Sequence, residues 1–116
     1  MAVTSVKAGS APKADPAAIL QLFHSPVREV ITSFMDCGKP QYEVVLLEDG
    51  RYVFFDHAYT DRTVFAASDD VFELLDKVRE LQRQDVVPIF DAALAQVFAV
   101  VFRHHAEAFA GFATVN

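Results

Sequence analysis

The order of apolar and polar positions divides the chain into helical and extended segments. Asp15-Pro16 predicts the first helix start, because Asp is a favourable N-cap and Pro is tolerated at the first helical position. Ser25-Pro26 repeats that signal, so we expect two short helices or one kinked helix. Gly38 and Pro40 then end the helical region. Its second part carries apolar residues at helical spacing at Val27, Val30, Ile31, Phe34 and Met35.

Two runs of β-branched and aromatic residues, YEVVLL and RYVFF, flank Asp49-Gly50 and predict a β-hairpin. A two-residue turn would place Glu43 opposite Asp56, where the like charges repel. A three-residue loop that includes Glu48, with the glycine in the left-handed conformation, places Glu43 opposite Phe55 instead. We therefore favour the three-residue loop. Both faces of this hairpin carry large apolar groups, so both need to be covered.

A possible short third strand follows at residues 63–65, and an amphipathic helix comes next. Residues 68–70 are Ser-Asp-Asp, which supplies an N-cap and a first turn that favour the positive end of a helix dipole. The charged residues of this helix lie away from its apolar stripe and form a solvated face. The stripe consists of Val71, Phe72, Leu74, Leu75, Val78 and Leu81.

Asp85 and Pro88 mark the start of the last segment, residues 87–113, which is predicted to be a long helix without a broad polar stripe. In its first half the only strongly polar side chains are Asp91 and Gln96. A small domain covers only part of such a helix, because small domains bury a lesser fraction of their surface. A second copy related by a twofold axis is the most economical cover for the rest, and the many alanines permit close approach. The interface candidates are Phe90, Leu94, Val97, Phe98, Val101, Phe102 and Phe109.

These segments together predict one α+β domain over residues 16–116. The preceding residues, 1–15, are rich in Ala, Ser, Lys and Pro and read as a flexible tail. Removing that tail should therefore leave the melting temperature almost unchanged.

Charge and composition exclude several classes of partner. A net charge of −6 disfavours nucleic acid, because binding depends on Lys and Arg that neutralise phosphates. A membrane span needs about 20 apolar residues, and the polar cluster Arg103-His104-His105 limits the run in the last helix. Cys37 is the only cysteine, so an intrachain disulfide is impossible and a reducing compartment fits best. The first sixteen residues lack the apolar stretch of a signal peptide, and we expect a cytoplasmic protein.

Candidate chemistry rests on a few histidines and acids. Asp56-His57 ends the second hairpin strand, while His104 and Glu107 are three residues apart on the last helix and can share a ligand. No HExxH motif or paired cysteine accompanies them, and no serine has the GxSxG context of a nucleophile. We therefore assign no catalytic residue and no cofactor. His57, His104 and Glu107 are retained only as candidate metal ligands.

The function that this pattern favours is a small, non-enzymatic protein–protein interaction domain. We expect it to self-associate, most simply as a homodimer, through the last helix, the hairpin face, or both. The alternative is a domain that binds a small hydrophobic ligand or uses a metal. In that case Asp56, His57, His104 and Glu107 would be its polar residues, and the eleven phenylalanines would surround a cavity.

Overall fold

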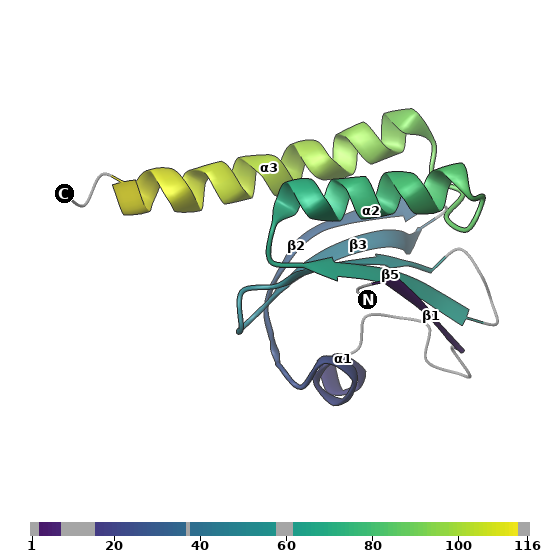
Figure 1. Cartoon of the computed structure of the whole chain (residues 1–116), viewed down its shortest axis with the longest axis horizontal. Coiled ribbons are helices and arrows are strands. Elements are labelled where there is room, and N and C mark those ends of the chain that lie inside the picture. The colour runs from purple at the N-terminus through teal and green to yellow at the C-terminus, as the bar shows by residue number, and fades with distance from the viewer. Residues whose placement is uncertain (1–2, 8–15, 37, 58–61, 114–116) are drawn as a thin grey trace.

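The computed structural model describes residues 3–7, 16–36, 38–57 and 62–113. Over these residues a five-stranded antiparallel sheet separates one short helix from two longer ones, which confirms the α+β class (Figure 1). The strand order is β1-β5-β4-β3-β2. In chain order the elements are β1 (Val3–Lys7), α1 (Pro16–Phe23), β2 (Val27–Asp36), β3 (Lys39–Leu47), β4 (Tyr52–Asp56), β5 (Arg62–Ser68), α2 (Val71–Arg83) and α3 (Asp91–Ala113).

The hairpin strands β3 and β4 are buried on both faces, as their doubly apolar sequence requires. Consecutive residues of β4 alternate between two cores: Tyr52 and Phe54 face the α2–α3 side, whereas Val53 and Phe55 face the α1 side. The α1 core is completed by Ile19 and Phe23. The α2–α3 core is larger and is completed by Val71, Leu74, Val78, Leu81, Val87, Ile89, Ala93, Leu94, Val97, Phe98 and Val101.

The β3–β4 hairpin has the predicted three-residue loop and register. Glu43 pairs with Phe55 and Tyr42 with Asp56. Gly50 has a φ of 96°, a conformation that a residue with a side chain seldom adopts. The loop closes through the Leu47 N–H, which donates to the Arg51 carbonyl at 2.8 Å. The like-charge contact that argued against the shorter turn is therefore absent from this register.

The prediction of a second helix after Ser25-Pro26 is wrong, because residues 27–36 form strand β2. Its pairing with β3 contains three register shifts, between Val27 and Glu29, Val30 and Thr32, and Phe34 and Met35. Each irregularity resets the alternation of inward and outward side chains. Ile31 and Phe34 consequently both pack against the α2–α3 core although they are three residues apart. This spacing imitates the period of a helix.

The Ser25-Pro26 dipeptide ends α1 and joins it to the hairpin loop. Ser25 Oγ accepts a hydrogen bond from the Asp49 N–H at 3.2 Å, and the Pro26 carbonyl accepts one from the Glu48 N–H at 2.9 Å. The chain leaves the helix at His24, whose φ is 58°. Ser25 and Pro26, which follow the helix end, are thus held to the β3–β4 loop.

Arg51 ties the end of α1 to that loop more firmly. Its Nη2 donates to the Phe23 carbonyl at 2.7 Å, and its Nε donates to Asp49 Oδ2 at 2.8 Å. The guanidinium also lies 5.4 Å from the centroid of the Phe23 ring. The hydrogen bond from Arg51 lowers the pKa of the Asp49 carboxyl.

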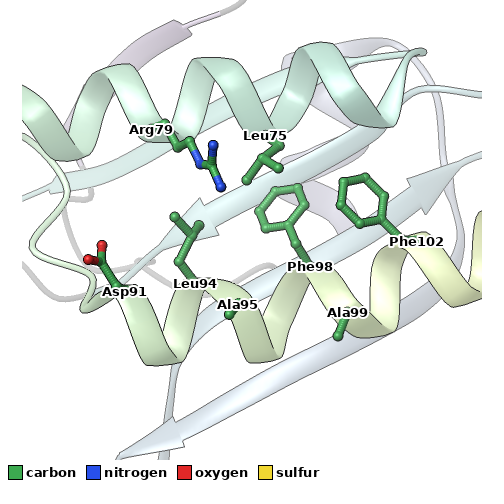
Figure 2. Close-up of a pocket in the computed structure, with 8 residues that line it drawn as sticks. All are labelled: Leu75, Arg79, Asp91, Leu94, Ala95, Phe98, Ala99 and Phe102. Carbon is green, nitrogen blue, oxygen red and sulfur yellow. The ribbon is translucent and has the colours of Figure 1, made fainter.

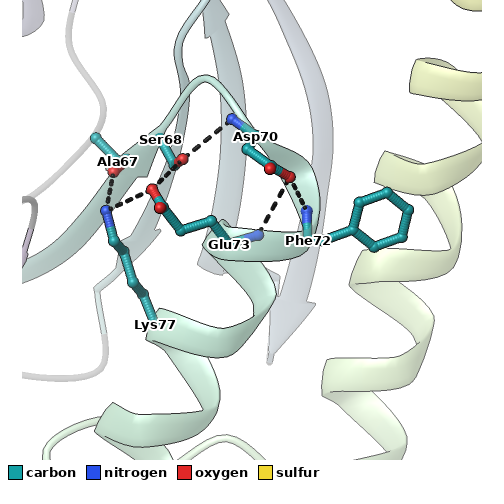
Figure 3. Close-up of polar contacts among 6 residues, drawn as sticks. All are labelled: Ala67, Ser68, Asp70, Phe72, Glu73 and Lys77. Carbon is teal, nitrogen blue, oxygen red and sulfur yellow. Dashed lines mark hydrogen bonds and ion pairs between the residues drawn. The ribbon is translucent and has the colours of Figure 1, made fainter.

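The predicted third strand and amphipathic helix are both present as β5 and α2. Asp70 is the N-cap, and its carboxylate accepts from the N–H groups of Phe72 and Glu73 (Figure 3). Ser68 Oγ donates to Glu73 Oε1 at 2.6 Å, and this hydrogen bond lowers the pKa of Glu73. Lys77 Nζ adds a bond to the Ala67 carbonyl at 3.0 Å. These polar contacts stabilise a helix start, which accounts for them without a ligand.

The long last helix begins at Asp91, later than Asp85 and Pro88 suggested. α2 ends at Arg83, and Asp85 has a φ of 58°, so the chain reverses there instead of beginning a helix. Val87 and Ile89 of the connection are buried in the core. Gln82 Nε2 then donates to Asp91 Oδ1 at 2.8 Å and holds the start of α3 against the end of α2.

The segment predicted as a flexible tail also differs in part. Residues 3–7 form β1, which pairs antiparallel with β5 from Val3 opposite Ala66 to Lys7 opposite Arg62. The stretch VTSVK has no large apolar residue that would have revealed a strand. β1 supplies backbone partners for one edge of β5, so truncation before residue 8 exposes that edge. Residues 8–15 lie outside the described part of the chain.

Replacing Arg51 with Ala should lower the free energy of unfolding by about 1–2 kcal/mol. Most of the loss should come from the bond to the Phe23 carbonyl, because an ion pair as exposed as that with Asp49 contributes little. Urea unfolding of Arg51→Ala and of the control Arg83→Ala checks this. Arg83 bonds only Glu80 among the contacts described for it. Equal stability of the two variants would contradict the role of Arg51.

Replacing Phe98 with Asp should unfold the domain, whereas Phe90→Asp should leave the free energy of unfolding of the monomer nearly unchanged. Phe98 is 2% exposed and Phe90 80% exposed. Truncating a buried Phe alone costs about 3–5 kcal/mol, and burying a charge costs more. Circular dichroism with denaturant titration measures both. A folded Phe98→Asp variant would show that α3 does not pack as described.

Candidate functional site

An open groove runs between α2 and α3 on the side of the molecule away from the sheet. Its volume is about 650 Å³. Figure 2 shows Leu75 and Arg79 of α2 directed toward α3, whose side chains form the opposite wall and whose Asp91 lies at one end. The lining is apolar apart from Arg79 and Asp91. The residues that α3 contributes are Asp91, Leu94, Ala95, Phe98, Ala99 and Phe102.

The helix α3 has no broad polar stripe because most of the exposed residues on its outward face are alanines. The four alanines at positions 92, 95, 99 and 106 are exposed, while Phe102 is half-buried. Positions 92, 99, 106 and 113 are seven residues apart, and positions 95, 102 and 109 repeat three residues later. We call these seven positions the α3 seam: Ala92, Ala95, Ala99, Phe102, Ala106, Phe109 and Ala113.

This seam has the spacing of a coiled-coil contact surface. Residues that alternate at three and four positions lie along one stripe of a helix and can pack between side chains of a facing helix. Ala95, Ala99 and Phe102 also line the groove, so the seam forms one of its walls. The side chains of Phe109 and Ala113 lie outside the described residues, and only their spacing places them on the seam.

The second half of α3 runs beyond the sheet (Figure 1). Successive residues on a helix point about 100° apart, so Ala106, Glu107 and Ala108 together sample most of its circumference. All three are exposed. Ala108 is on the side that carries Val97 and Val101, both buried in earlier turns. The described side chains after His105 are therefore exposed on every side of the helix that they sample.

Two large rings are exposed at the starts of α2 and α3. Phe90, just before α3, is the most exposed large hydrophobic residue described, and Phe72 is 64% exposed at the start of α2. The Phe72 ring stacks on Phe102 at a centroid distance of 5.2 Å. Exposed apolar patches of this kind are uncommon on monomeric proteins and often mark an interaction surface.

The seven interface candidates from the sequence separate into three groups. Leu94, Val97, Phe98 and Val101 are buried in the domain's own core, and Leu94 and Phe98 also line the groove. Phe90 and Phe102 remain accessible, and the side chain of Phe109 lies outside the described residues. The sequence indicated that the many alanines of this helix permit close approach, but not which of them lie on the exposed stripe. Their seven-residue repeat was the signal available in the sequence.

The buried histidine at the end of β4 belongs to a different part of the molecule. His57 Nε2 lies 2.8 Å from Glu43 Oε1, and Ser33 Oγ donates to Glu43 Oε2 at 3.2 Å. The carboxylate thus stands between the serine and the imidazole. In a nucleophilic triad the imidazole must stand between the other two, because it takes the proton of the hydroxyl. This arrangement cannot activate Ser33.

His104 joins α3 to the sheet at the opposite end of β4. Its Nδ1 lies 3.4 Å from the Tyr52 hydroxyl, and its Nε2 lies 3.1 Å from Glu29 Oε1. The neighbouring His105 ring meets Tyr52 edge-on at 6.2 Å. Burial raises the pKa of the Tyr52 hydroxyl, and the charge of Glu29 raises it further.

The structure does not bring the candidate metal ligands together. Tyr52, which contacts His104, is five residues from His57, a separation of about 16 Å along an extended strand. The two histidines also approach β4 from opposite faces, since His57 stacks on Phe55 and His104 meets Tyr52. Asp56 is fully buried, and Glu107 is exposed. Within the described ranges no group of three or more His, Cys, Asp or Glu side chains is placed to hold a metal ion.

The pKa of Tyr52 should lie above 10.0, the ordinary tyrosine value. An acid with a raised pKa in the folded state stabilises that state below the unfolded pKa, and the contribution is lost as the pH rises through the folded pKa. The free energy of unfolding should therefore fall above pH 10, less steeply in Tyr52→Phe. Ring chemical shifts followed by NMR measure the pKa. Titration of Tyr52 at or below pH 10 would contradict its burial beneath α3.

None of the described helices combines the length and the hydrophobicity that crossing a bilayer requires. Comparison with protein-family models, with curated proteins and with solved structures gave no significant match for this chain. Its function is therefore to be inferred from its own residues. The groove, the α3 seam and the exposed rings beside them form the surface that most needs an explanation.

Proposed function

We propose that the chain is a non-enzymatic, self-associating interaction domain of the cytoplasm that pairs with a second copy through the α3 seam and the adjoining groove. The observation that carries the proposal is the seam itself, a heptad stripe of small and aromatic residues whose described alanines are exposed. The single cysteine is compatible with a reducing compartment.

The composition of the seam favours contact with a second helix rather than exposure to solvent. A helix face made for solvent ordinarily carries charged and polar residues. Here the only charged side chains on the outward half of α3 are Asp91, Arg103 and Glu107, and Asp91 and Glu107 lie near opposite margins of it. Alanine lets two helix backbones approach closely, and Phe102 supplies a larger group that can fill the space beside a small one. The hairpin faces are buried within the domain, so they add nothing to this surface.

A small apolar ligand in the groove is the alternative that a specific observation favours. The volume of about 650 Å³ is within the range of small-molecule sites. The groove is only partly enclosed, however, and the polar groups at it are Arg79 and Asp91. An elongated surface partner fits such a shape better than a ligand that must lose most of its hydration in an enclosed cavity.

Ala99→Glu should raise the dissociation constant of the dimer by about 100-fold or more, because the symmetry places two like charges within one dry contact. The control Ala108→Glu makes the same substitution at an exposed position of α3 on the side away from the seam. Size-exclusion chromatography with light scattering over a dilution series gives the mass. The wild type and the control should reach twice the chain mass of 12.9 kDa.

A wild-type protein that stays monomeric at every concentration would contradict self-association. If that monomer also bound a fluorescent apolar probe, and the Ala99→Glu variant bound the probe more weakly, the ligand alternative would be favoured. Because position 99 is exposed and Glu is a good helix former, the variant should remain folded. A change in its circular dichroism spectrum would show that the loss of dimer is a folding defect.

A further inference from the structure

We infer that the two copies pair with their α3 helices antiparallel, in the register that places Ala99 of one copy beside Phe102 of the other. This inference rests on the proposed self-association and adds the orientation and the register. In this register the positions that meet have residue numbers that sum to 201. The groove is then completed by the projecting second half of the partner's α3.

The sizes of the seam residues favour this pairing. One set of seam positions, 92, 99, 106 and 113, holds only alanine, whereas the other set holds Ala95, Phe102 and Phe109. In the antiparallel register positions 92, 99 and 106 of the first set meet positions 109, 102 and 95 of the second, so that Phe102 lies against Ala99. In a parallel pair every residue meets itself. Phenylalanine layers would then alternate with alanine layers, and no single distance between the helices would pack both.

The charges on α3 favour the same orientation. In a parallel pair Asp91 and Arg103, which flank the seam, would each stand at the level of the identical residue of the other copy, and like charges placed side by side repel. In the antiparallel register Arg103 lies at the level of Phe98, two residues from Gln96, whose amide oxygen can accept its hydrogen bond. The opposed helix dipoles add a further attraction.

We select this register because it brings the second copy over the exposed Phe90 and over the wall of the groove. Phe90 is 80% exposed, and at the sum of 201 it stands level with Gly111 of the second copy, a position without a side chain. Moving the pairing by one heptad toward the C-terminus, to a sum of 208, would place Phe90 five residues past Ala113, the last residue of α3, so the helix of the second copy would not cover the ring. The chosen register also lays the projecting half of each α3 along Ala95 and Ala99 in the wall of the other groove.

Cysteine cross-linking tests the orientation and register directly. In a Cys37→Ser background, which leaves no native thiol, Ala95→Cys and Ala106→Cys are prepared separately, one of them labelled with nitrogen-15. Both positions are exposed, so the fold should tolerate the changes. After subunit exchange and mild oxidation, the mixture should give at least about ten-fold more covalent dimer than either variant alone, because disulfides need closely spaced Cα atoms. Mass spectrometry should find one labelled and one unlabelled chain in it.

Each variant alone should cross-link poorly, since in this register position 106 is displaced from its own copy by eleven residues, about 16 Å along the helix. Efficient self-linking of Ala106→Cys would show a parallel pair and overturn the inference. A dimer by light scattering that forms no disulfide between positions 95 and 106 would also overturn it, while self-association would stand. A Cys37→Ser protein that is monomeric by light scattering would refute the proposed function together with the arrangement.

Discussion

Burial of both faces of the β3–β4 hairpin is the constraint on which the rest of the fold depends. Consecutive strand residues point to opposite faces, so the apolar runs of the two strands make both faces of the hairpin apolar. Neither face can then remain exposed to solvent. One layer of helix on each side is the result. α1 is only eight residues long and contributes Ile19 and Phe23, so its attachment depends on the hydrogen bonds of Ser25 and Arg51 to the loop and helix end. The opposite face requires the two longer helices.

The sequence predicts these elements where local chemistry decides the outcome. The hairpin register follows from one repulsive pair, Glu43 with Asp56, and the start of α2 follows from the capping side chain of Asp70. Prediction fails for β2 because three irregularities in its pairing move its inward residues from a period of two toward the period of a helix. They arise from the fit of one strand to its neighbour, which a pattern within a single segment does not contain. The strand β1 depends in the same way on the edge of β5.

The candidate surface was recognised only in part for a related reason. A long apolar helix indicates that much of its circumference is covered, but the side that meets the sheet is decided by the direction in which the chain enters the helix. Here that direction buries Val97, Phe98 and Val101 and turns Ala92, Ala95 and Ala99 outward. The helix is therefore apolar all round for two reasons: one side fills the core, and the other is a smooth stripe that we propose packs against a second copy.

Amide hydrogen exchange along α3 at two protein concentrations tests that claim most directly. The half of α3 that packs on the sheet should be protected at both concentrations and so serves as an internal reference. If a second copy covers the seam, residues 106–113 should exchange slowly in concentrated protein and faster on dilution, because a helix end without tertiary support frays. Rapid exchange of residues 106–113 at every concentration would contradict the account, since the projecting half of α3 would then have no partner in solution.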